Sequence, residues 1–298
     1  EKEGVPPIVL QRILDEDTNL ISGNTDAGIS ITASSNTNRV EGNLIGTDLS
    51  GNAALRNGLA GLLFGSSATN NTVGGANERR NIISGNAPNG GIVIANGAGQ
   101  NTISGNYIGL NKAGTSALPN HWGVTLIDAS NGVGSSTGPP NIISGNEAGV
   151  VIAGDQGVPL SGVNVVNNRI GTDPSGQTAI PNMEGVILLE NVSNSSISGN
   201  LISGNNRYGV LTGGINVGAS NISISDNKIG TKLDGSNALP NKTGVLLAFG
   251  ANNCTVSNNV ISGNTDSGVQ LCGGGVGSFT SREVFQILGK TEGPNTLP

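Results

Sequence analysis

The chain has few aromatic and few charged residues. Its 298 residues include four Phe, two Tyr and one Trp, and charged residues make up only 11%. Nucleic-acid binding depends on neutralising phosphates with Lys and Arg, so 14 such residues and a net charge of −6 disfavour it. Low charge also argues against a disordered chain, because disorder requires high net charge and little to bury. The apolar 35% of the chain therefore predicts a narrow core of Ile, Val and Leu.

Long apolar runs are also missing. No stretch approaches the roughly 20 residues of a membrane span, so no transmembrane segment is expected. No cofactor is expected either. The chain has two cysteines, Cys254 and Cys272, and two interpretations of them stay open. They form a disulfide at one corner of the fold, or they are small buried residues.

The chain is instead rich in glycine, with 49 residues, and in an internal repeat. One phrase reads DNKIGTKLDGSNALPNKTGVLL from Asp226 and has copies from Asn167, Gly105 and, less well matched, Gly42. Between these copies lies a shorter phrase, typified by NIISGN from Asn81. A repeat that persists along the chain makes it a quasi-linear array in which each unit contacts its neighbours.

Alignment of the two phrases on their leading Asn places one Asn in every unit. Gaps of 24 to 27 residues alternate with gaps of 32 to 38. Stacked Asn side chains one strand spacing apart can pass amide hydrogen bonds from unit to unit. The predicted structural ladder consists of Asn19, Asn43, Asn81, Asn106, Asn141, Asn168, Asn200, Asn227 and Asn259.

Short alternating apolar runs predict the strands of each unit. Ile92 and Ile94, like Val150 and Ile152, are separated by one residue, which is typical of a strand with one buried face. Gly, Asn, Ser and Asp end each run and indicate turns. A unit of about 30 residues is most economically wound once and stacked in parallel on the next. We therefore predict an all-β parallel β-helix, or β-solenoid, of about ten coils in which short and long coils alternate.

The motifs also resemble a known family. NxIGTDxxGxxALPNxxGVxL alternating with NIISGNxxxGIxI is similar to the right-handed parallel β-helix proteins of the pectin-lyase-like superfamily, most of all to repeat-rich extracellular proteins of bacteria. The resemblance covers nearly the whole chain. It implies a single-stranded right-handed coil and an extracellular or cell-surface location. It leaves function open, because that superfamily holds lyases, hydrolases, epimerases, tailspikes and structural shafts.

The two ends suggest an assembly. We expect one continuous β-helix over residues 1–298, with degenerate terminal coils at 1–18 and 273–298. The segment FQILGKTEGPNTLP imitates part of the long phrase, and EKEGV imitates the residues that come after Leu-Pro in the other long units. The ends would then complete one another between copies, and a heterologous contact of that kind generates a filament. The alternative to this assembly is that the two terminal coils are merely degenerate copies of the repeat, with a capping helix in PPIVLQRILDED.

One group of acids is the best candidate for chemistry. Asp128, Asp155 and Glu190 each follow a glycine of the repeat by five or six residues, on three successive coils. Such residues are predicted to stack about 5 Å apart. A stack of this kind can bind Ca²⁺ through oxygen ligands or raise one carboxyl pKa by mutual repulsion. The alternative is three solvated loop acids.

Other polar residues are weaker candidates. Asp26, Glu147 and Asp266 are predicted to lie four coils apart, too far for acid–base work on one bond. His121 has no matching Ser or Cys nucleophile, and it shares an outward loop with Trp122. Sugar-binding faces usually offer several aromatic platforms, so an isolated Trp is a weak indication of one.

The favoured function is a non-enzymatic structural β-solenoid that forms, or belongs to, an extracellular fibre or surface shaft. Its partners would be copies of itself stacked head to tail, and it would have no catalytic or metal site. One alternative is a polysaccharide-active enzyme of lyase or epimerase type that uses Asp128, Asp155 and Glu190, with Ca²⁺ as a possible ligand. The other is a spike that binds a surface polysaccharide or receptor.

Overall fold

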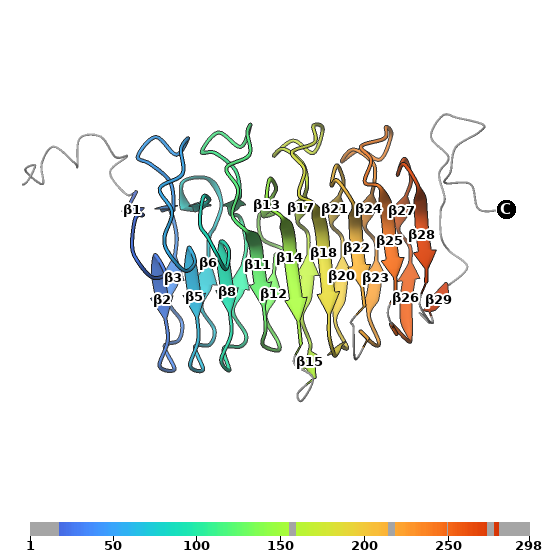
Figure 1. Cartoon of the computed structure of the whole chain (residues 1–298), viewed down its shortest axis with the longest axis horizontal. Coiled ribbons are helices and arrows are strands. Elements are labelled where there is room, and N and C mark those ends of the chain that lie inside the picture. The colour runs from blue at the N-terminus through green and yellow to red at the C-terminus, as the bar shows by residue number, and fades with distance from the viewer. Residues whose placement is uncertain (1–17, 155–158, 214–217, 249, 273–276, 280–298) are drawn as a thin grey trace, which may run out of the picture.

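The computed structural model describes residues 18–154, 159–213, 218–248, 250–272 and 277–279. These segments wind into an elongated coil whose axis runs horizontally in Figure 1. The strands of its three large sheets pair only in parallel, and each coil pairs with the coil before it and the coil after it. The fold is the predicted right-handed parallel β-helix with almost no helix. Nine coils lie within the described residues, and the expected tenth lies outside them.

Every coil contributes one strand to each of three nine-stranded sheets, which we call A, B and C. Sheet A contains β1 (Leu20–Ile21), β4 (Leu44–Ile45), β7 (Ile82–Ile83), β10 (Tyr107–Ile108), β13 (Ile142–Ile143), β17 (Arg169–Ile170), β21 (Leu201–Ile202), β24 (Lys228–Ile229) and β27 (Val260–Ile261). Sheet B contains β2 (Ile29–Ile31), β5 (Leu62–Phe64), β8 (Ile92–Ile94), β11 (Trp122–Leu126), β14 (Ala148–Ala153), β18 (Glu184–Leu189), β22 (Tyr208–Thr212), β25 (Thr243–Leu247) and β28 (Ser267–Leu271).

Sheet C completes each coil. It contains β3 (Arg39–Val40), β6 (Thr72–Val73), β9 (Thr102–Ile103), β12 (Gly132–Val133), β16 (Asn164–Val166), β20 (Ser196–Ser198), β23 (Ser223–Ser225), β26 (Cys254–Ser257) and β29 (Gly277–Phe279). A two-stranded sheet joins β15 (Leu160–Ser161) and β19 (Val192–Ser193). The described residues hold a single helix, the 3₁₀ turn η1 (Asn77–Arg79), so none is long and apolar enough to cross a membrane.

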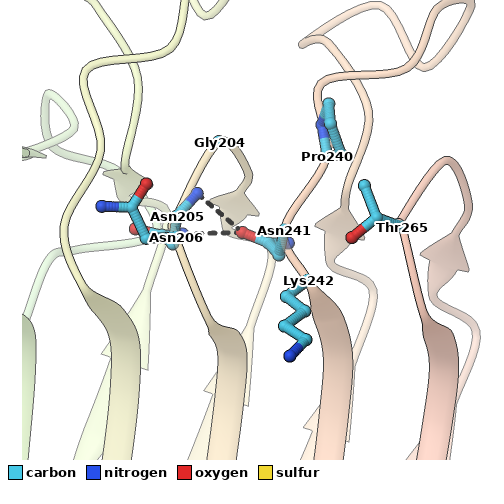
Figure 2. Close-up of a pocket in the computed structure, with 7 residues that line it drawn as sticks. All are labelled: Gly204, Asn205, Asn206, Pro240, Asn241, Lys242 and Thr265. Atoms are coloured by element: carbon cyan, nitrogen blue, oxygen red, sulfur yellow. Dashed lines mark hydrogen bonds between the residues drawn. The ribbon is translucent and has the colours of Figure 1, made fainter.

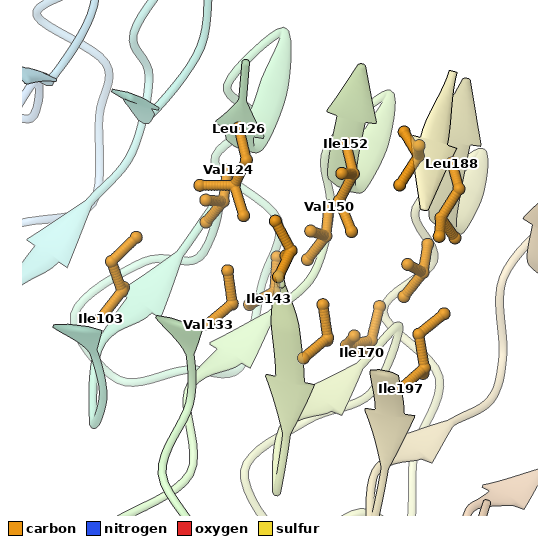
Figure 3. Packing of buried hydrophobic residues seen from close by; sticks show 14 of the residues in the cluster. Ile103, Val124, Leu126, Val133, Ile143, Val150, Ile152, Ile170, Leu188 and Ile197 are labelled. Atoms are coloured by element: carbon orange, nitrogen blue, oxygen red, sulfur yellow. The ribbon is translucent and has the colours of Figure 1, made fainter. Parts of the chain in front are cut away.

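Inward side chains from the three sheets form one continuous apolar column. Figure 3 shows Leu126, Ile152 and Leu188 of sheet B following one another along the axis, with Ile143 of sheet A and Val133 of sheet C packed around them. All five are at most 1% exposed. Burying an aliphatic side chain stabilises a fold by about 1.5–3 kcal/mol. The same contribution recurs with each coil, which makes stability approximately additive along the axis.

The leading Asn residues occupy the corner between sheets C and A. Each one donates a hydrogen bond from Nδ2 to Oδ1 of the next, at 2.8 to 3.0 Å, without a break from Asn19 to Asn259. The amides also satisfy backbone carbonyls, as Asn106 does for Val73 O at 3.0 Å. Eight of the nine side chains are buried, so these bonds lie in a dry corner.

A second Asn ladder, which alignment on the leading Asn does not reveal, lies at the corner between sheets A and B. Its members end the SGN motif in short units and the LPN motif, or its variants LRN and IPN, in long ones. Their Nδ2–Oδ1 distances are 2.8 to 3.2 Å. They are Asn24, Asn57, Asn86, Asn120, Asn146, Asn182, Asn205, Asn241 and Asn264. A third, shorter ladder links Asn38, Asn71, Asn101 and Asn131 between sheets B and C.

Outer loops explain the alternation of short and long units. In coils 2, 4, 6 and 8 the chain leaves the coil after sheet A and returns through an antiparallel bridge, such as Leu110–Ala117. These loops line the upper edge in Figure 1 and cover a second apolar cluster on the outer face of sheet A. The short coils hold the loops in place, because Ser84 Oγ donates to Leu110 O at 2.7 Å and accepts from Gly109 N at 3.1 Å.

The predictions for the terminal segments and for the two cysteines concern residues near the ends of the described chain. Most of the terminal segments 1–18 and 273–298 lie outside the described residues, so their mutual completion stays a prediction; β29 pairs with β26 as a coil strand would. Both cysteines are free thiols: Cys254 is buried in sheet C, whereas Cys272 is exposed after β28 of sheet B. Burial raises the pKa of the Cys254 thiol.

Candidate functional site

Two of the three predicted acids, Asp128 and Glu190, lie just beyond the ends of their sheet B strands. The pairing of Leu126 with Ile152, and of Ala153 with Leu189, places Asp128 and Glu190 in one column with Gly154 between them. Asp155 lies outside the described residues. Asp128 Oδ2 accepts a hydrogen bond from Gly97 N at 2.8 Å. Within the described segments no three His, Cys, Asp or Glu residues are grouped to hold a metal ion, and a role for this trio stays a prediction.

A different set of residues meets at the start of the sheet B strands. Trp122 pairs with Ala148, and Ala148 pairs with Glu184. The register of β18 on β22 then brings Tyr208 beside Glu184. One column along the axis therefore carries an aromatic residue at each end, three coil steps or about 14 Å apart at roughly 4.8 Å per coil. We call His121, Trp122, Glu147, Glu184, Arg207 and Tyr208 the aromatic–charged strip.

Both aromatic side chains of the strip lie at the surface. Trp122 and Tyr208 are half-buried, and each ring contacts the exposed residue that precedes it, His121 or Arg207. The glycine that follows each one faces the core: a Cβ added at Gly123 would lie 2.8 Å from Ile143 Cγ2, and one at Gly209 would lie 3.0 Å from Ile229 Cγ2. The other aromatic side chains that the structure describes are Phe64, fully buried, and Tyr107, 8% exposed.

Two close polar contacts between neighbouring coils flank the two rings. His121 Nδ1 lies 2.8 Å from Glu147 Oε2, and Arg207 Nη1 lies 2.8 Å from Glu184 Oε1. The His121 ring centroid is 4.9 Å from that of Trp122, and the Arg207 guanidinium carbon is 5.1 Å from the Tyr208 centroid. The contact between His121 and Glu147 is exposed, and an exposed pair adds little stability. The two contacts place the aromatic rings beside polar groups, including the cation Arg207 and the carboxyl group of Glu184.

A hollow of about 290 Å³ lies next to the Tyr208 end of the strip (Figure 2). Its floor includes two members of the second ladder: Asn205 N and Nδ2 both donate to Asn241 Oδ1, at 3.0 and 2.9 Å. The full lining is Gly204, Asn205, Asn206, Pro240, Asn241, Lys242 and Thr265. The hollow thus spans coils 7 to 9 at the corner between sheets A and B, and its lining is mainly polar.

Comparison with known proteins agrees with this architecture. Residues 120–283, more than half of the chain, match the model of the family described as right handed beta helix region. The chain belongs to this family. No curated protein matches the sequence.

Two solved structures share the fold at low similarity. Full-length tailspike protein 2 from Escherichia coli O157:H7 bacteriophage CAB120 aligns at 12% identity and a TM-score of 0.39, covering 87% of this chain and 38% of that one. The enzymatically active domain of tailspike protein 2 from bacteriophage CBA120 aligns at 12% identity and a TM-score of 0.36, covering 89% and 42%. This β-helix thus spans less than half of either tailspike chain, and similarity at this level carries no argument about function.

The two carboxyl groups of the aromatic–charged strip, those of Glu147 and Glu184, differ in their surroundings. Burial raises the pKa of Glu184, Arg207 opposes that rise through its charge and its hydrogen bond, and the nearby charge of Glu147 adds to it. The Glu184 side chain is 12% exposed, whereas that of Glu147 is 58% exposed. The strip therefore combines a shielded carboxyl group with a solvated one on neighbouring coils.

Proposed function

We propose that this protein binds an extended carbohydrate chain along the aromatic–charged strip. The observation that supports it is the placement of Trp122 and Tyr208 in one column with both rings at the surface. Aromatic rings are rigid and apolar on their faces, so they suit the C–H faces of sugar rings. The charged groups between them offer donors and acceptors for sugar hydroxyls. A polymer lying parallel to the β-helix axis can use both platforms at once.

The location and partners follow from this proposal. A surface polysaccharide is the partner, and the protein acts outside the cell or at the cell surface, where such polymers are found. Stacking of copies into a fibre is a separate hypothesis. It has no supporting contact among the described residues, whereas the aromatic–charged strip is fully described. Carbohydrate binding is therefore the better-supported function.

Replacing Trp122 with Ala is expected to weaken polysaccharide binding by about 10- to 100-fold, the range found when a central aromatic contact is removed. Binding is first located with an array of immobilised polysaccharides and then measured by calorimetry. Leu55, 48% exposed on an outer loop, provides the control, and Leu55→Ala should bind like the wild type. A wild type that binds no polysaccharide, or equal affinities for the two variants, would refute the proposal.

Cleavage of the bound chain is a second candidate function, favoured by the carboxyl groups of Glu147 and Glu184 on adjacent coils. Paired carboxyl groups cleave glycosidic bonds when one donates a proton, and a raised pKa keeps that proton in place at higher pH. Glu184→Gln should abolish the release of reducing ends and retain binding. Wild-type cleavage should fall as the pH rises through the raised pKa of Glu184. Cleavage that survives in Glu184→Gln would contradict this assignment.

A further inference from the structure

We infer that the hollow beside Tyr208 takes the acetamido group of an N-acetylated sugar. The inference rests on the proposed function and narrows the class of carbohydrate. Asn206 precedes Tyr208 by two residues, and Thr243, which follows Lys242, pairs with Tyr208 in sheet B. The rim residues Asn206 and Lys242 thus lie within two residues of Tyr208 and of its paired residue Thr243, which places the hollow within reach of a substituent on a sugar stacked on Tyr208.

The floor of the hollow has little hydrogen-bonding capacity to spare. Gly204 N donates to Leu239 O at 3.0 Å. Asn205 donates from its backbone N and from Nδ2 to Asn241 Oδ1, and from Nδ2 also to Ile170 O at 3.3 Å. Asn241 in turn donates from Nδ2 to Asn264 Oδ1 at 3.0 Å. A bound group must therefore be recognised by the exposed side chains at the rim.

The side chains at the rim match an acetamido group. Asn206 and Thr265 each supply a donor and an acceptor, and Lys242 supplies donors. Figure 2 shows Pro240 and Thr265 around the opening next to Asn241. An acetamido group presents one N–H, one C=O and one methyl group. The N–H can donate to the side-chain oxygen of Asn206, and the C=O can accept from Thr265 or Lys242. The methyl group can pack against the Pro240 ring.

The charges around the hollow favour a neutral group over an anion. Lys242 Nζ lies 3.6 Å from Asp266 Oδ2, and Arg207 is paired with Glu184. Each cation next to the hollow thus has its own carboxylate. A carboxylate, sulfate or phosphate would have to compete with these partners, whereas an amide group gains hydrogen bonds without displacing them.

Two β-1,4-linked oligosaccharides isolate the acetamido group. Chitotetraose carries it at C2 of every sugar, and cellotetraose carries a hydroxyl group there. Wild-type protein is expected to bind chitotetraose about tenfold more tightly, the effect of one or two net hydrogen bonds. The double variant Asn206→Ala with Thr265→Val should lose most of that preference. Thr178→Val, which removes an exposed hydroxyl group from an outer loop, should keep it.

The possible outcomes separate this inference from the proposed function. Three results would each overturn the acetamido assignment. They are equal affinity for the two oligosaccharides, a preference that the double variant retains, and tighter binding of an oligogalacturonate than of chitotetraose. Binding that Trp122→Ala still weakens would leave the strip as the carbohydrate site in all three cases. Failure of the wild type to bind chitotetraose overturns the inference as well, and the polysaccharide array then decides the proposed function separately.

Discussion

Gly109→Ala is expected to lower the stability of the β-helix by about 3–5 kcal/mol, the sum of a backbone collision and a strained conformation. Gly109 has a φ of +87°, and an added Cβ would lie 2.3 Å from both Asn146 Oδ1 and Ser144 O on the next coil. Neither atom can move without breaking the second Asn ladder or the sheet. Thermal unfolding followed by circular dichroism should show a melting temperature lower by roughly 10 °C.

Gly199 provides the matched control for this experiment. Its φ is +65°, but a Cβ added there has no heavy atom within 4 Å. Gly199→Ala therefore shares the strain of a positive φ without the collision, and its cost should be about 1 kcal/mol. If the two variants lose similar amounts of stability, backbone strain alone accounts for the effect of Gly109→Ala. Successive coils would then not be as closely packed as described.

Asn106→Ala is expected to cost about 3–5 kcal/mol, because it removes three side-chain hydrogen bonds from a buried corner and leaves a cavity there. Asn106 Nδ2 donates to Val73 O and to Asn141 Oδ1, both at 3.0 Å, and its Oδ1 accepts from Asn81 Nδ2 at 2.9 Å. Water cannot easily replace these bonds in a fully buried corner. The same thermal measurement should detect the loss as a clear fall in melting temperature.

Asn19→Ala tests whether the effect depends on position in the ladder. Asn19 is exposed and donates from its amide to Asn43 Oδ1 at 2.9 Å. Its loss should cost at most about 1 kcal/mol, since solvent can reach the partner. If Asn19→Ala and Asn106→Ala are equally harmful, or both harmless, the ladder does not stabilise the interior of the coil.

Much of the fold could be predicted from the repeat. In a β-helix each unit pairs only with its neighbours, so the spacing of Asn81, Asn106 and Asn141 already determines which residues lie above one another. The second ladder was equally accessible, because Asn86, Asn120 and Asn146 end motifs that recur once in every unit. It was missed because the units were aligned on their leading Asn alone.

The site was harder to predict. Trp122 and Tyr208 each stand directly before a glycine of the repeat, in HWGV and RYGV, and alignment on that glycine would have placed them in one column. Trp122 looks isolated when only the long units are compared, because Tyr208 belongs to a short one. Of the predicted acids Asp128, Asp155 and Glu190, the first and the last share a column in which Gly154 lies between them.

The winding of the β-helix follows from the sequence alone, because periodic spacing and period-two apolar runs admit one economical way to bury every unit. Which side chains face solvent, and which residues they contact, depends on the packing of the coils against one another. Gly123 and Gly209 pack against the core residues Ile143 and Ile229, while Trp122 and Tyr208 beside them stay half-buried at the surface. Likewise, Glu184 is shielded and paired with Arg207 because residues of neighbouring coils close around it. Orientation and shielding depend on contacts between coils, and spacing along one chain does not specify them.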